Sequence, residues 1–236
     1  MSQSSAKAIT VRYCFRLEKD QQEIFDLQLD AKTLEVVNRP QEDLPSWTKL
    51  DFHRCAHCPL DPSIHRDCLA ASCLADVIKK FNRICSYDQL LLEVTINQRH
   101  ISQSTTAQQG LRSLMGLLMA TSGCPHTLFL KPMARFHLPL SNEEETFSRA
   151  IGMYLLSQYF QQQEGVQANL DLSGLQQLYR NLHTVNMAIA ERLRPSVQAD
   201  SSLNAVILLD LFTLAIPMVI EDKLDEIRHW FAPAPL

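Results

Sequence analysis

Residues 9–17 read ITVRYCFRL, a stretch in which apolar and polar side chains alternate. An alternation with a period of two is typical of a β-strand that has one buried face and one face in water. The buried face is expected to carry Ile9, Val11, Tyr13, Phe15 and Leu17. This stretch therefore predicts that the first third of the chain forms a half-buried sheet.

The sequence on either side of the next loop extends this sheet. The alternation recurs at residues 25–29, and again at residues 90–105, where Asn97-Gln98 supplies the turn of a second hairpin. A short candidate strand at residues 34–36 ends before Pro40, since proline cannot donate to a strand ladder.

The remaining segments predict helices and loops. Apolar residues three and four positions apart indicate helices over residues 67–84, 107–121, 141–163 and 173–193, and from about residue 200 onward. Loops are expected at residues 51–66 and 124–140. Ser141 and Glu144 form a capping box, Asp171 or Ser173 caps the following helix, and Gly123 suits a left-handed helix end.

Strands and helices are thus segregated along the chain, which predicts an α+β fold with an antiparallel sheet. We expect residues 1–105 to form the antiparallel sheet plus one helix. We expect residues 106–236 to form a helical bundle that packs on this sheet, so that the whole chain is one compact unit.

Residues 205–220 are apolar on almost every side. Asp210 lies in the middle of this segment, and a central carboxylate is costly in lipid. We therefore predict a buried helix, the most central of the bundle, and no membrane association. Any apolar face left exposed on it would favour a homodimer. A buried Asp210 needs a partner, and His183, Arg149 and Arg135 are the candidates.

Composition narrows the classes of function. The chain has 236 residues, 46% of them hydrophobic, and a net charge of −4, which argues against a nucleic-acid partner. Six glycines leave no Gly-rich phosphate loop. We find no secretory signal, so the seven cysteines are expected to be reduced in a cytoplasm.

The cysteines suggest a metal site. Cys55 and Cys58 form a CxxC motif, and two sulfurs at this spacing on a turn can coordinate the same metal ion. Cys68 and Cys124 lie at helix ends, so these four thiols are the predicted ligands of zinc or, as an alternative, of an iron–sulfur cluster. The substitute ligands are His53, His57, His65 and His126. An unmetallated thiol cluster and a disulfide or redox pair are the other interpretations.

A second candidate site contains Lys131, Arg135 and His137, which lie within seven residues and suit an anion or a carboxylate. Structural hydrogen bonds to backbone carbonyls are the alternative role for these side chains. The sequence lacks the common catalytic motifs. We therefore favour a metal-containing binding or regulatory protein with a protein or small anionic ligand as partner. The alternative is an enzyme that acts on a small anionic substrate with Arg135 and His137 beside the cysteine cluster.

Three short motifs, CxxCP, SGCPH and RFHLP, together resemble those of an uncharacterised bacterial protein family. The residues that carry the resemblance are Cys55, Cys58, Pro59, Ser122, Gly123, Cys124, Pro125, His126, Arg135, Phe136, His137 and Pro139. The resemblance covers the chain from Leu50 to about Asp225. It implies a bacterial cytoplasmic protein and brings no activity with it.

Overall fold

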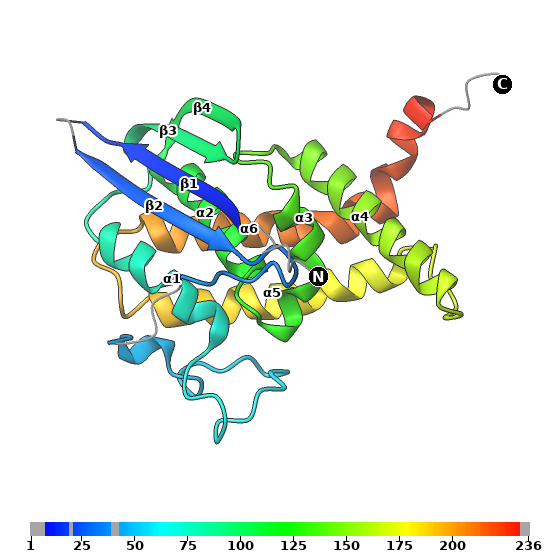
Figure 1. Cartoon of the computed structure of the whole chain (residues 1–236), viewed down its shortest axis with the longest axis horizontal. Coiled ribbons are helices and arrows are strands. Elements are labelled where there is room, and N and C mark those ends of the chain that lie inside the picture. Colours follow the sequence, from blue (N-terminus) through cyan, green and yellow to red (C-terminus); the bar gives the residue numbers. More distant parts are fainter. Residues whose placement is uncertain (1–7, 19–20, 39–42, 232–236) are drawn as a thin grey trace, which may run out of the picture.

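The computed structural model describes residues 8–18, 21–38 and 43–231. Four strands form one sheet in the order β2-β1-β3-β4, and each neighbouring pair is antiparallel. The strands are β1 (Ile9–Arg16), β2 (Gln22–Leu29), β3 (Gln89–Ile96) and β4 (Arg99–Thr106). Most of the helices follow the sheet in the chain (Figure 1), which confirms the predicted α+β fold.

The helices of the described residues form two layers behind the sheet (Figure 1). They are α1 (Leu69–Lys80), α2 (Ala107–Ala120), α3 (Lys131–Arg135), α4 (Glu143–Gln163), α5 (Ser173–Leu193) and α6 (Ser201–Met218). Shorter helical turns are η1 (Ser46–Thr48), η2 (Pro125–Leu130), η3 (Val219–Lys223) and η4 (Leu224–Phe231). The first layer contains α1 and α2, and α5 and α6 pack together behind α2.

The buried face of the sheet is the one that the alternation predicts. Tyr13 and Phe15 of β1 are fully buried. Arg16, on the opposite face of the same strand, pairs with Glu93 of β3. Phe15 reaches α2 at Gly110, where an added Cβ would lie 2.9 Å from the phenyl ring. Glycine at this position therefore lets the helix approach the sheet closely.

The prediction that residues 205–220 form the most central helix is wrong. α2 lies between the sheet and α6, and its side chains Leu111, Leu114 and Met115 are fully buried. α6 packs on α2 and α5 with one side only, and its other side exposes Ile207, Leu211, Leu214 and Met218. Apolarity on all sides predicted burial on all sides, but the described elements bury less than half of the helix.

One described helix, Ser201–Glu221, is long and apolar enough to cross a membrane, and 28% of its apolar window is buried.

The start of α4 differs by one residue from the prediction. The capping box is formed by Asn142 and Glu145, not by Ser141 and Glu144. The Glu145 N–H donates to Asn142 Oδ1 at 2.8 Å, and the Asn142 N–H donates to Glu145 Oε2 at 2.9 Å. Both pairs have the same spacing in the sequence, so the spacing by itself does not select between them.

Two other local predictions need correction. Residues 124–140, expected to be a loop, contain η2 and α3. The candidate strand at residues 34–36 is reduced to a single bridge between Val36 and Leu29. Gly123 has φ +82°, and Asn97 begins the two-residue turn between β3 and β4, as predicted.

Candidate functional site

The four cysteines of the predicted metal site come from three separate segments. Cys55 and Cys58 lie in one turn of the 51–66 loop, where the Cys58 N–H donates to the Cys55 carbonyl at 3.1 Å. Cys68 is the N-cap residue of α1, and Cys124 is the N-cap residue of η2. Cys68 and Cys124 are buried, and the other two are half-buried against the same core.

Two of these thiols, Cys55 and Cys124, have raised pKa values to which the other thiols contribute. Burial raises the pKa of Cys124 to about 12, and negative charge at Cys68, Cys55 and Cys58 adds to this increase. Burial likewise raises the pKa of Cys55 to about 11, with contributions from Cys68 and Cys58. Cys55 and Cys124 are therefore within electrostatic range of the other thiols in this group.

All seven cysteines are reduced thiols. Cys73 is buried on α1, Cys85 is half-buried beyond the end of that helix, and Cys14 lies on β1. Within residues 8–18, 21–38 and 43–231, no three His, Cys, Asp or Glu side chains are placed closely enough to hold a metal ion.

Two of the four substitute ligands connect the segments that carry the thiols. The rings of His57 and His126 stack with their centroids 3.8 Å apart. His126 Nε2 lies 3.0 Å from the His57 carbonyl, and His57 Nε2 lies 3.0 Å from the Asn181 carbonyl on α5. His53 is exposed and packs edge-on against Phe52. The backbone N–H of His65 donates to the Asp61 carbonyl within the loop.

Arg192 of α5 anchors the chain just before this loop. Its side chain is 1% exposed and donates to the carbonyls of Trp47, Lys49 and Leu50 at 2.8, 2.6 and 3.0 Å. The Arg192 Nε atom is buried and has no hydrogen-bond partner. The positive charge of Arg192 opposes the increase in the pKa of Cys55. A buried cation therefore lies within electrostatic range of the thiols.

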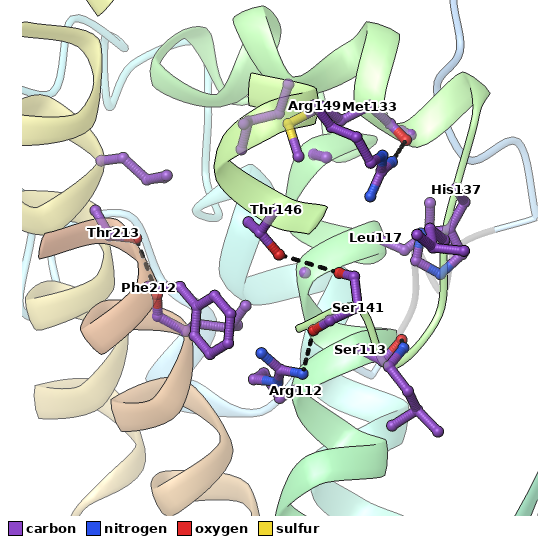
Figure 2. A pocket seen from close by; sticks show the side chains of 18 of the residues that line it. Arg112, Ser113, Leu117, Met133, His137, Ser141, Thr146, Arg149, Phe212 and Thr213 are labelled. Atoms are coloured by element: carbon purple, nitrogen blue, oxygen red, sulfur yellow. Dashed lines mark hydrogen bonds between the residues drawn. The ribbon is translucent and has the colours of Figure 1, made fainter. Parts of the chain in front are cut away.

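The three residues of the second predicted site do not gather at one point. Lys131 pairs with Glu35, with Nζ and Oε1 3.0 Å apart. Arg135 is exposed, and its guanidinium lies 5.3 Å from the centroid of the Phe136 ring. Only His137 of the three faces the cavity between the helices that Figure 2 shows.

His137 forms part of a hydrogen-bonded chain that begins on the sheet. Tyr13 Oη contacts both His137 Nε2 and Ser113 Oγ, the latter at 2.9 Å. Ser113 Oγ also accepts from the Leu140 N–H at 3.1 Å. Burial, together with the charge of Arg149, lowers the pKa of His137 to about 3. The imidazole is therefore neutral, and its Nε2 can accept a hydrogen bond from the Tyr13 O–H.

The cavity contains two arginines in place of Arg135. Arg112 comes from α2 and Arg149 from α4 (Figure 2). Arg112 is not among the residues that the sequence patterns indicate, and Arg149 was expected only as a partner for Asp210. The sequence does carry one sign of Arg112, which interrupts the mostly apolar stretch 111–119. A charged side chain is seldom buried in such a stretch unless it is paired.

Asp210 pairs with His183, one of its three candidate partners. His183 Nδ1 lies 2.9 and 3.0 Å from the two carboxylate oxygens. Asn186 donates to the same carboxylate at 3.3 Å and to Thr213 at 2.9 Å. This network joins α5 to α6 and accounts for the carboxylate within the apolar helix.

Residues 10–232 match the family described as "Domain of unknown function (DUF6901)". No curated protein and no solved structure matches the chain. The match covers the sheet, the thiol-bearing segments and the cavity alike, and it includes more than nine-tenths of the sequence. The chain therefore belongs to the DUF6901 family.

Proposed function

We propose that this protein binds a metal ion, zinc, through Cys55, Cys58, Cys68 and Cys124, and that it is a cytoplasmic binding or regulatory protein rather than an enzyme. The observation that carries the proposal is that Cys55 and Cys124, 69 residues apart in the chain, lie within electrostatic range of each other and of Cys58 and Cys68. A tetrahedral zinc site needs four such donors.

The local structure around each thiol suits this role. The CxxC turn carries two sulfurs on one short stretch, which is how structural zinc sites commonly obtain half of their ligands. Cys68 precedes the first turn of α1, where the helix dipole favours negative charge. The remaining thiol, Cys124, starts a second helical turn. The four thiols thus lie in a turn or at the start of a helical segment, and a bound zinc ion would supply the charge that stabilises the buried thiolates.

Arg192 supplies charge balance. Zinc with four thiolates carries a net charge of −2, and burying that charge is costly without a nearby cation. Arg192 is fully buried, acts on Cys55 electrostatically, and forms no ion pair with a described acidic residue. A metal–thiolate centre would give this guanidinium a counter-charge.

Metal binding would also stabilise the 51–66 loop. Sulfurs that share a zinc ion lie about 2.3 Å from it and about 3.5–4 Å from one another. Drawing the four thiols to these separations would tie the loop to α1 and η2. The free energy of binding would then contribute to folding, because an unfolded chain offers no preformed site.

The test is metal analysis of the full chain, purified without oxygen and without chelators. We expect one zinc per chain, and intense thiolate-to-metal absorption after replacement by cobalt. Cys55→Ser and Cys124→Ser should each lose the metal, whereas the matched control Cys14→Ser should retain it.

If the analysis finds iron and acid-labile sulfide, the same four ligands hold an iron–sulfur cluster and not zinc. No metal in the purified chain, together with no uptake of added zinc, would overturn the proposal. In that case, thiol counting before and after mild oxidation separates a redox pair from simple free thiols.

A further inference from the structure

A cavity of about 150 Å³ lies among α2, α3, α4, α5 and α6. Most of its wall is apolar and includes Leu117, Met133, Leu182 and Phe212. Two guanidinium groups lie on different sides of this space in Figure 2. No cysteine contributes to the lining, so this cavity is distinct from the proposed metal site.

Arg112 is the more deeply buried of the two arginines, with 8% of its surface exposed. One of its terminal nitrogens donates to the Ser141 carbonyl at 3.0 Å, and its Cζ atom lies 4.2 Å from the centroid of the Phe212 ring. Its Nε atom is buried and has no hydrogen-bond partner. A buried donor without a partner costs about 1–3 kcal/mol, and more if the group is charged.

Arg149 enters the cavity from α4. It donates to the carbonyls of Met133 and Phe136 at 3.0 and 2.9 Å. Glu145 lies one helical turn earlier, but its carboxylate accepts the Asn142 N–H in the capping box. Among the described acidic residues, none forms an ion pair with Arg149 or Arg112.

The other polar groups of the wall are neutral. Tyr179 is 4% exposed, and burial raises the pKa of its hydroxyl, so the group remains an O–H donor. Burial keeps His137 uncharged. The wall therefore carries two positive charges. Burial lowers the pKa of both guanidiniums, and Tyr179 and Glu145 offset only part of this decrease for Arg149.

We propose that this cavity binds a small organic monocarboxylate with an apolar body, whose carboxylate lies between Arg112 and Arg149. Guanidinium groups suit carboxylates because the planar fork donates two parallel hydrogen bonds. Leu117, Leu182 and Phe212 would contact the apolar body. A cavity of about 150 Å³ is large enough for a benzene-sized molecule, which limits the ligand to about one ring or a short alkyl chain.

The composition of the wall favours a carboxylate over a phosphate as the anionic group of the ligand. A phosphate carries more charge and needs more donors around it, whereas most of this wall offers none. An apolar wall with a few convergent polar groups is the usual arrangement for a small organic ligand.

The test is calorimetric titration of the full chain with benzoate and hexanoate. Benzamide serves as the neutral probe of equal shape, and inorganic phosphate as the anion without an apolar body. We expect a carboxylate to bind at least about thirtyfold more tightly than benzamide or phosphate, which corresponds to about 2 kcal/mol.

Arg149→Gln should weaken the binding of the carboxylate by at least about thirtyfold and leave that of benzamide nearly unchanged. Arg135→Gln is the matched control, because it removes a neighbouring positive charge that does not line the cavity. Arg112→Gln should act like Arg149→Gln, and a thermal melt without ligand verifies that each variant is folded.

Equal binding of benzoate and benzamide would overturn the assignment, as would failure of both carboxylates to bind. Tighter binding of phosphate than of benzoate would overturn the monocarboxylate class. Cys55→Ser should bind the carboxylate normally, so that loss of the metal site and failure of this cavity remain distinguishable.

Discussion

His57 and His126 lie face to face, with their ring planes 12° apart and their centroids separated by 3.8 Å. His57 is the second of the two residues between Cys55 and Cys58 in the CxxC motif, and His126 lies two residues after Cys124. Each imidazole also contacts a backbone carbonyl of another segment. The pair therefore fastens the 51–66 loop to η2 and α5.

His126→Ala should lower the free energy of unfolding by about 1–2 kcal/mol, because it removes one hydrogen bond and the ring contact. Urea unfolding of the metal-free chain measures this change. His65→Ala is the control, because alanine retains the hydrogen bond that the backbone N–H of His65 donates within the loop. Equal loss in both variants would mean that the stacked pair contributes nothing specific.

Cys124→Ser should destabilise the zinc-bound protein by several kcal/mol, which is the scale of losing a structural metal. Cys14→Ser should change the free energy of unfolding by less than about 0.5 kcal/mol, because Cys14 lies on the face of β1 opposite to the buried Tyr13 and Phe15. Chemical unfolding with and without a chelator measures both effects. A similar loss in the two variants would contradict a shared site.

Arg192→Met should lower the stability by at least about 3 kcal/mol, since it leaves three buried carbonyls without their donor. Arg194→Ala is the matched control on the same helix. Its guanidinium forms an exposed pair with Glu191, and such pairs contribute about 0–1 kcal/mol. Thermal and urea unfolding provide the comparison, and a near-neutral Arg192→Met would refute the anchoring role.

The neutral His137 predicts a dependence of stability on pH. Its pKa is about 3 in the folded protein and 6.5 in the unfolded chain, so below pH 6.5 the unfolded state binds the additional proton. This contribution to stability is present above pH 6.5 and is lost progressively as the pH falls toward 3, by up to about 1.4 kcal/mol per unit. Urea unfolding between pH 7.5 and 4.5 measures the slope, which His137→Gln should reduce by about one proton. An unchanged slope in the variant would contradict a buried neutral imidazole.

Ile207, Leu211, Leu214 and Met218 are spaced by four, three and four residues, which places them on one stripe of α6. We predict that a second copy of the chain covers this stripe. Sedimentation should detect a dimer for the wild-type chain and a monomer for Leu211→Glu, while Ile64→Glu, at another exposed apolar side chain, should remain dimeric. A monomeric wild-type chain, or one that binds lipid vesicles instead, would contradict this prediction.

The strands were predictable because their signal is local. The alternation that begins at Ile9 places the first strand within one residue of β1, and the turn at Asn97 fixes the register of β3 on β4. The thiol segments were likewise identifiable as turns and helix ends. The start of α4 was identifiable only to within one residue, because Ser141–Glu144 and Asn142–Glu145 both have the spacing of a capping box.

Contacts between distant parts of the chain were not predictable. Nothing in the stretch around Tyr13 indicates a hydrogen bond to His137, which lies 124 residues further on. Arg112 lies in an apolar helix, and only the packing of five helices shows that it lines a cavity. The exposure of Leu211 likewise depends on which neighbours cover α6, and its sequence is apolar on every side.

The hydrogen bonds from Arg192 to the carbonyls of residues 47–50 join positions 142 to 145 residues apart in the chain. During translation, the cysteine-rich loop emerges long before the arginine that anchors it. Contacts of such large sequence separation form late and slow folding, because chain closure must come first. Cys55, Cys58 and Cys68 therefore spend the synthesis of α2 to α5 without this anchor, and in that interval they are open to oxidation or to capture of the wrong metal.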